Sequence, residues 1–169
     1  MTTRNVLYVR SAPLLWTNTG GDKLLNAKAL AHSTGRLGAF YDRGAGALPI
    51  EAEVRAYGAW AVAPTLNRSI AVALFESDGT HQDAGVAFHE VNDAALTLAQ
   101  IEAAAGYVGD VVAHTADTDE KGNSWRVLIS SRYFAPGLYN RDAGQTLANV
   151  DGATAVVVTF LIPQLQAEA

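Results

Sequence analysis

Two glutamates on one predicted strand are the residues best spaced for acid–base chemistry. Glu51 and Glu53 are separated by one residue, and Arg55 follows at the same spacing. Side chains two positions apart on a strand share a face and lie roughly 7 Å apart, a separation at which paired carboxylates can cleave a glycosidic bond. The alternative is a charge network on one face of a sheet. We adopt this alternative.

A second candidate is a loop that resembles the start of a calcium site. Asp117 and Asp119 have the spacing of the first two ligands, and Gly122 has that of the turn glycine. However, Lys121 occupies the fifth position, and Leu128 stands where a bidentate glutamate is needed. We therefore interpret residues 117–123 as the polar tip of a hairpin.

Other catalytic and ligand-binding motifs are missing from the sequence. There is no nucleophile elbow, no phosphate-binding glycine loop followed by a helix, and no zinc-protease motif. With no cysteine, the chain lacks thiolate chemistry and disulfides. The four histidines show no zinc-ligand spacing, and they are His32, His81, His89 and His114. We predict no catalytic, cofactor-binding or metal-binding residue, and hence no enzyme and no cofactor.

Composition favours contact with other proteins. The 169 residues are 49% hydrophobic and only 17% charged, with a net charge of -5. An acidic chain without a basic run is not expected to bind nucleic acid or an anionic membrane. The longest apolar run, Ala155 to Ile162, is far shorter than the ~20 residues of a membrane span. The first ten residues lack the features of a secretory signal, so we treat them as mature sequence.

One cluster of aromatic and apolar residues is a candidate contact patch. These residues flank a predicted turn at Ala135-Pro136-Gly137, where exposed side chains would meet a partner. The alternative is a strand end tucked under the sheet. The residues are Tyr133, Phe134, Leu138 and Tyr139.

These groups are positioned by a chain that is almost entirely β-strand. Ile50 to Tyr57 alternates apolar and polar residues, which predicts a strand with one buried face. Arg68 to Glu76 is nearly all apolar, as expected for a strand covered on both faces. We expect these two strands to form a long central hairpin. Pro163 should end the last strand, which starts at Thr154.

The remaining pattern predicts a single domain over residues 1–169. One short helix is expected between Ala94 and Glu102, capped by Asn92 or Asp93. With turn signals between the strands, about eight or nine strands indicate an all-β sandwich or barrel. The other predicted strands are Val6–Val9, Lys23–Leu30, Arg36–Asp42, Gly106–His114 and Ser124–Phe134.

Six segments together carry a resemblance to a known group of proteins: they are Ser33–Ala45, Glu51–Trp60, Ala63–Thr65, Ser69–Asp78, Leu98–Thr115 and Arg132–Tyr139. They resemble small all-β virion proteins encoded near the head genes of tailed bacteriophages. The resemblance implies a jelly-roll-like β-sandwich used as a capsid decoration or cement protein. Such a protein lies on the outside of the head, binds the major capsid protein and ties capsomers together. The group has no catalytic motif, so no functional residue is carried over.

Two other functions stay open. Some proteins of the same general shape belong to tails, so the chain could be a tail or fibre-associated module that contacts carbohydrate or protein. The third possibility is a hydrolase on a sandwich fold. We also expect self-association into a homodimer or homotrimer, because sandwiches with open strand edges are commonly protected by pairing with a neighbour.

Overall fold

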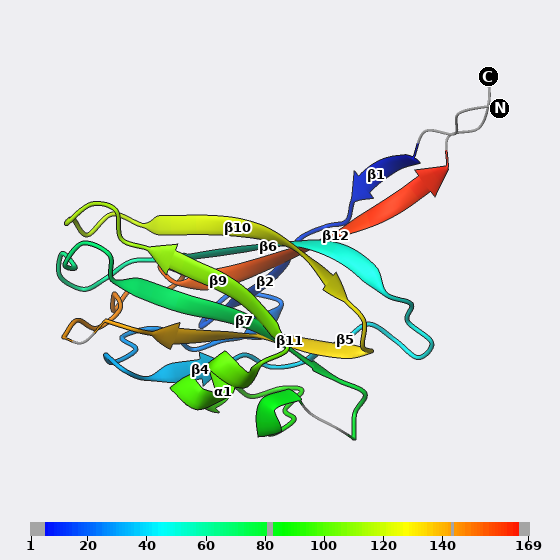
Figure 1. Ribbon diagram of the computed structural model, residues 1–169, viewed down its shortest axis with the longest axis horizontal. Helices are drawn as coiled ribbons and strands as arrows, with labels where there is room; N and C mark the ends of the chain where they lie inside the picture. The colour runs from blue at the N-terminus through cyan, green and yellow to red at the C-terminus, as the bar shows by residue number, and fades with distance from the viewer. Residues whose placement is uncertain (1–5, 81–82, 143, 166–169) are drawn as a thin grey trace.

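The computed structural model describes residues 6–80, 83–142 and 144–165, and it confirms the all-β sandwich (Figure 1). There are more strands than the eight or nine expected, because several pair over only two to four residues. A 3₁₀ turn, η1 (Asp83–Gly85), and a helix, α1 (Leu98–Ala103), complete the elements. The strands are β1 (Val6–Arg10), β2 (Leu14–Thr17), β3 (Lys23–Leu24), β4 (Gly35–Leu37), β5 (Tyr41–Asp42), β6 (Ile50–Gly58), β7 (Ser69–Ser77), β8 (Ala94–Leu96), β9 (Gly106–Val112), β10 (Lys121–Ile129), β11 (Tyr133–Asn140) and β12 (Ala155–Leu165).

The strands form two sheets of six. The first has the order β10-β6-β12-β2-β3, and β1 pairs with the far end of β12. The second has the order β8-β4-β11-β7-β9, and β5 pairs with β11 beyond β4. The two longest early strands, β6 and β7, therefore lie in opposite sheets, so the predicted central hairpin is wrong. Residues 59–68 cross from one sheet to the other instead of turning within one.

Burial along β6 and β7 agrees with their sequence patterns. Ala52, Val54 and Ala56 of β6 are buried, while Glu51 and Arg55 are exposed. On β7, one set of side chains packs between the sheets, and the other packs on the outer face of the second sheet. Residues of α1 and of the segment before it cover that outer face. The prediction of a strand buried on both faces is confirmed.

The single α-helix forms within the predicted segment but begins later. Residues 94–96 are strand, and Thr97 is the N-cap. The Thr97 hydroxyl accepts from Gln100 N at 3.2 Å, and Gln100 Oε1 accepts from Thr97 N at 3.0 Å, which completes a capping box. Asp93 does not cap the helix, because its carboxylate accepts from Asn26 N at 3.1 Å.

Pro136 and Gly137 lie inside β11 and do not turn the chain, which corrects the prediction. The turn comes earlier, at Ser130–Arg132, and it divides the predicted strand Ser124–Phe134. Pro136 is tolerated because it faces the interruption between β4 and β5, where Gly38 N donates to its carbonyl oxygen at 2.8 Å. A Cβ on Gly137 would lie 2.5 Å from the Phe75 ring, so close packing requires the glycine.

Three further strand predictions need correction. The predicted strand Lys23–Leu30 is strand only at Lys23–Leu24, and Ala29 has a φ of 51°. Arg36–Asp42 is divided between β4 and β5. β12 continues through Pro163 to Leu165, because its last residues pair with β1.

The β1–β12 pair forms a two-stranded ribbon that projects from one end of the sandwich (Figure 1). Loops that join the two sheets lie at both ends of the sandwich, and the loop between β5 and β6 lies at the ribbon end. Among the described residues, no helix is long and apolar enough to cross a membrane.

Candidate interaction surface

The four residues predicted as a contact patch are core residues. Tyr133 and Tyr139 are 9% and 8% exposed, and Phe134 and Leu138 are 0% and 1% exposed. The prediction that these side chains are exposed is wrong. They belong to β11, a central strand with β7 on one side and β4 and β5 on the other. The alternative, a buried strand, describes these residues.

Two of the charged groups singled out in the sequence, Glu53 and Lys121, lie in separate ion pairs, while Glu51 and Arg55 are exposed on β6. Glu53 pairs with Arg10 at 2.6 Å on the outer face of the first sheet. Lys121, in the calcium-like loop, pairs with Asp117. This loop does not join a hairpin as expected, because β9 and β10 belong to different sheets. Among the described residues, no three His, Asp or Glu side chains are grouped as a metal site would need.

The histidines are also apart. His32 and His114 are exposed and His89 is half-buried, while His81 lies outside the described residues.

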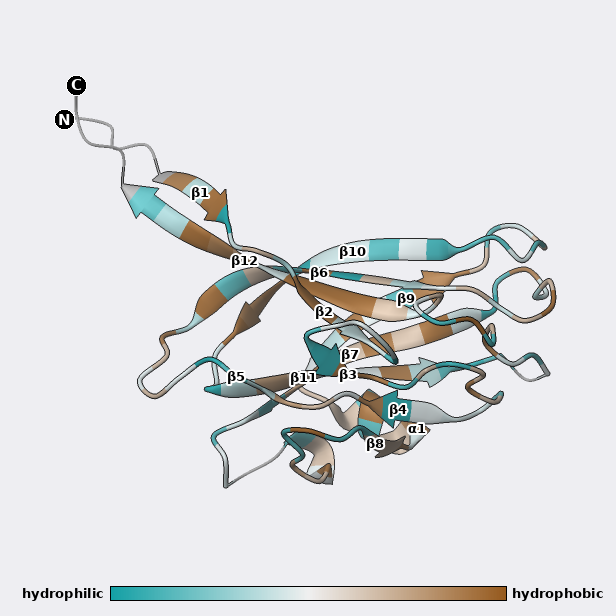
Figure 2. Ribbon diagram, turned by 180° about the vertical axis from the view of Figure 1, so that it is seen from behind, coloured by the Kyte–Doolittle hydropathy of each residue, from teal (hydrophilic) through white to brown (hydrophobic). Residues whose placement is uncertain are grey.

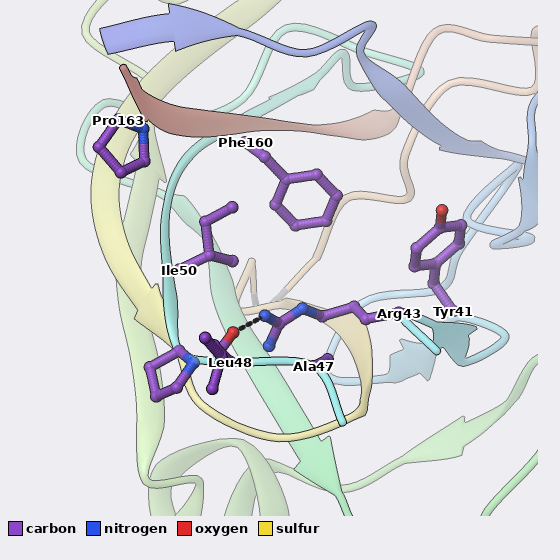
Figure 3. A pocket seen from close by; sticks show the side chains of 8 residues that line it. Tyr41, Arg43, Ala47, Leu48, Ile50, Phe160 and Pro163 are labelled. Carbon is purple, nitrogen blue, oxygen red and sulfur yellow. Dashed lines mark hydrogen bonds between the residues drawn. The ribbon is translucent and has the colours of Figure 1, made fainter. Parts of the chain in front are cut away.

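An apolar hollow of about 490 Å³ lies at the base of the projecting ribbon (Figure 3). The loop between β5 and β6 forms one wall, and β12 forms the other. Leu48 at the rim is 77% exposed. The principal side chains that line the hollow are Tyr41, Leu48, Pro49, Ile50, Phe160 and Pro163.

Arg43, which also lines the hollow, fixes the loop beside it through polar contacts. Its guanidinium donates to Ile129 O at 3.0 Å and to Ser131 O at 2.8 Å. It also donates to Leu48 O (Figure 3). Burial lowers the pKa of Arg43 from its ordinary value. Glu76 accepts from the backbone N–H groups of Ser130 and Ser131, so both loops are fixed to the sandwich.

A bidentate ion pair fixes the next strand. Arg132 donates to both carboxylate oxygens of Asp42, at 2.7 and 2.6 Å, and its guanidinium carbon lies 4.7 Å from the centre of the Tyr133 ring. The hydrogen bonds from Arg132 lower the pKa of Asp42 from 3.8 to about 2. The pair ties β5, beside the hollow, to the start of β11.

We expect Asp42 to contribute stability above about pH 4 that is lost as the pH falls towards 2. The sign follows because the pKa of the folded state lies below that of the unfolded chain. Asp42→Asn should reduce the free energy of unfolding at pH 6 but not at pH 2, as measured by denaturant titration at each pH. Arg132→Gln should change the pH profile in the same way, and an unchanged acid limb in both variants would contradict the assignment.

The ribbon continues the apolar surface away from the hollow. Leu7 is 51% exposed, Tyr8 46% and Ile162 42%, and Val9 and Pro163 are also exposed. In Figure 2 apolar stretches alternate with polar ones on both strands. A two-stranded ribbon is marginally stable alone in water, so the exposed apolar side chains on it form a candidate contact surface.

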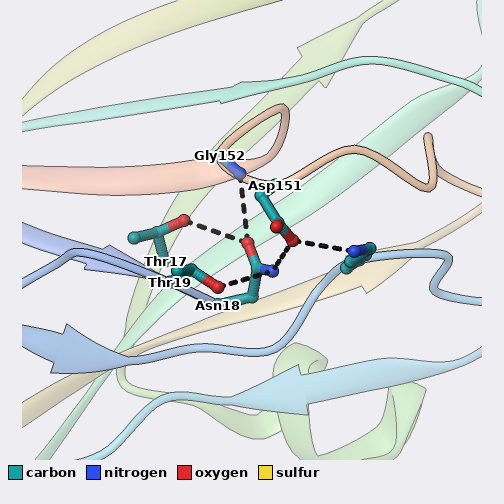
Figure 4. A network of polar contacts seen from close by, with 6 residues as sticks. Thr17, Asn18, Thr19, Asp151 and Gly152 are labelled. Carbon is teal, nitrogen blue, oxygen red and sulfur yellow. Dashed lines mark hydrogen bonds and ion pairs between the residues drawn. The ribbon is translucent and has the colours of Figure 1, made fainter.

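A polar network stabilises the end of the sandwich opposite the ribbon (Figure 4). The Asn18 side chain accepts from Gly152 N at 3.1 Å and donates to Asp151 at 2.6 Å, and Lys28 pairs with Asp151 at 2.8 Å. The bonds from Lys28 and Asn18 lower the pKa of Asp151. These contacts hold three loops together, so we interpret the network as structural.

A smaller hollow of about 300 Å³ is lined by Glu102, Tyr107 and Arg141. The Tyr107 hydroxyl donates to Asp110 at 3.0 Å, and Arg141 pairs with Glu102 at 3.5 Å. Tyr107 is 44% exposed. Desolvation raises its pKa, and the nearby Asp110 carboxylate adds to the effect.

Sequence reasoning missed the hollow and the ribbon as a surface. Leu48 and Pro49 follow a glycine-rich loop, and Val6–Val9 was predicted only as a strand. The available signal was that Leu7, Tyr8 and Val9 are successive apolar residues on a short strand, so both of its faces are apolar.

The sequence matches no protein-family model, and neither a curated protein nor a solved structure matches it.

Proposed function

We propose that this chain is a structural virion protein of a tailed bacteriophage, which binds the major capsid protein on the outside of the head and stabilises the shell as a decoration or cement protein. The observation that carries the proposal is the exposed apolar surface made by the ribbon and the hollow at its base. The resemblance of the sequence to small virion proteins provides the setting in which such a surface is used.

The arrangement of the charged side chains supports binding to another protein rather than catalysis. Of the carboxylates first considered for catalysis or metal binding, Glu53 and Asp117 are each engaged by a cation of the same chain. The surface offered to a partner is instead formed by leucine, isoleucine, proline and aromatic groups around Leu48. Apolar residues with a few fixed polar groups are typical of the centre of a protein interface.

The negative net charge of the chain supports a location on the outer side of the shell. A protein that lined packaged DNA would face a dense array of phosphates and would be expected to be basic. This chain has a net charge of -5 and a pI near 5.2.

A second function, a tail or fibre-associated module that binds carbohydrate, is favoured by one feature. The hollow beside Tyr107 combines a partly exposed aromatic ring with the carboxylate of Glu102 and the guanidinium of Arg141. An apolar face with a few convergent polar groups is the usual composition of a small-molecule site. Tyr107→Ala would abolish sugar binding under this alternative and leave head binding unchanged under the first.

We expect purified protein to bind heads that lack it with little dependence on salt. Because the surface is apolar, affinity should change by less than about tenfold between low and high salt. Leu48→Asp should weaken binding by about tenfold or more, since burying a leucine contributes about 1.5–3 kcal/mol. Co-sedimentation with heads measures both effects, and imaging of the decorated particles locates the protein.

Val150→Asp is the matched control for this experiment. Val150 is also exposed, at 60%, but it precedes the start of β12, whereas β1 pairs with the other end of that strand. Its replacement introduces the same charge and should leave binding to heads unchanged. Equal losses from both variants would contradict the role of the hollow, and density on the tail would contradict the cement function.

A further inference from the structure

The projecting ribbon has one strand edge that is open for pairing. β12 pairs with β6 along one side and with β2 and then β1 along the other. Among the described strands, β1 pairs only with β12. Residues 7–10 of β1 are all exposed. Within the part of the chain that the structure describes, the outer edge of β1 is therefore uncovered along the strand.

The hydrogen-bond pattern identifies the backbone groups on this edge. Ser11 N donates to Phe160 O at 3.0 Å, which makes these two residues a hydrogen-bonded pair. Such pairs alternate along an antiparallel ladder, so the next bonded partners are Val9 with Ile162 and then Leu7 with Gln164. The N–H and C=O groups of Tyr8 and Arg10, which lie between the bonded positions, point away from β12.

The other long edges of the ribbon and sandwich are protected. On the far side of β12, Pro163 has no N–H to offer at the unpaired edge beyond β6. β9 carries Asp110 and an irregularity in its pairing with β7, and β10 carries Lys121 and Arg126. The edge strands β3, β5 and β8 have only two or three residues. Open edges promote pairing with another chain, so β1 stands out among the described strands.

We infer that β1 binds β1 of a second copy of this chain, antiparallel about a twofold axis at Tyr8. In this register Tyr8 faces the partner's Tyr8, and Arg10 faces the partner's Val6. These are the residues whose backbone groups point outward, so the register matches hydrogen-bond donors to acceptors. The result is a continuous four-stranded sheet, β12-β1-β1-β12, across the two copies.

The side chains of β1 are compatible with pairing to themselves. Leu7 would lie opposite the partner's Val9, which joins apolar groups on one face. The only charge of the strand, on Arg10, lies two residues from the axis, so it does not face the partner's Arg10, and it is balanced by Glu53 of its own chain. An isologous contact needs this self-complementarity. The contact is short, so the dimer should form reversibly and depend on protein concentration.

Cysteine cross-linking tests the register directly, because the natural chain has no cysteine. Directly opposed residues of a hydrogen-bonded pair have Cα atoms about 5.5 Å apart, within disulfide range. Under mild oxidation, Tyr8→Cys should form a covalent dimer at least fivefold faster than Leu128→Cys. Leu128 is a matched control, since it is at least as exposed as Tyr8, at 58% against 46%, and lies on another strand of the same sheet.

Sedimentation of the protein without cysteine gives the second measurement. Wild type should pass from monomer to dimer as its concentration rises. Tyr8→Lys places two ammonium groups at the axis, so it should raise the dimer dissociation constant at least tenfold at low salt and less at high salt. Leu128→Lys should leave the constant unchanged, and circular dichroism should show that both variants are folded.

A protein that stays monomeric at every concentration, or that forms a trimer, would overturn the inference. Equal cross-linking at positions 8 and 128 would do the same. These measurements use the isolated chain in solution, and they are independent of where it binds on a virion. A dimer on the tail would contradict only the proposed function, and a monomer on the head would contradict only the twofold pairing.

Discussion

Trp16→Ala should lower the free energy of unfolding by about 3–5 kcal/mol, the usual cost of removing a large buried aromatic side chain. Trp16 is 0% exposed, and its ring centre lies 5.4 Å from that of Phe134, which connects the two sheets. Its indole N–H donates to Ala39 O at 2.8 Å. Denaturant unfolding followed by circular dichroism measures the loss, which is a large part of the 5–15 kcal/mol typical of a domain.

Trp16→Phe separates packing from hydrogen bonding. The phenyl ring keeps most of the contact with Phe134 but leaves the buried Ala39 carbonyl unpaired, so we expect a loss of about 1–3 kcal/mol. A loss below 1 kcal/mol for Trp16→Ala would show that the interface between the sheets does not depend on this residue.

Local strand patterns were readable in the sequence, whereas the assignment of strands to sheets was not. The alternation in β6 and the apolar run in β7 depend on which faces are covered, and both patterns appear in the structure. Whether consecutive strands pair or cross between sheets depends on contacts far apart in sequence. The pairing of β6 with β12 and of β7 with β11 left no local signal.

Proline and glycine gave the most misleading signals. Pro136-Gly137 is typical of a turn, but here it lies in a central strand because the gap between β4 and β5 removes the need for a proline N–H. Pro163 is typical of a strand end, yet β1 supports β12 beyond it. Each exception arises from a neighbouring strand that the sequence alone could not place.

The candidate surface was missed for the same reason. Tyr133 and Phe134 looked accessible because a turn was expected beside them, and the structure buries them with β11. Leu48 and Tyr8 are far apart in sequence, and they belong to one surface only because β12 runs past both the loop before β6 and strand β1. The number of apolar residues predicted a contact surface, and the topology determines where it lies.

Under the proposed function, phage heads that lack this protein should assemble but release their DNA at a lower temperature than the parent particles. A protein that binds only the assembled shell stabilises it by mass action, by about 2.7 kcal/mol per site when its free concentration is a hundred times its dissociation constant. Contacts that bridge neighbouring subunits act together, so the gain over a whole shell is larger than for one site. We expect a decrease of roughly 5 °C or more in the temperature of DNA release.

The experiment compares gene-deleted particles with the same particles after protein is added back. Wild-type protein should restore the release temperature of the parent, and Val150→Asp should do so equally well. Leu48→Asp should restore it only at higher protein concentration, because the hollow beside β12 is altered while the fold is kept. If deleted and parent particles release DNA at the same temperature, the shell does not depend on this protein, and the tail-associated binding module becomes the better account of its exposed surface.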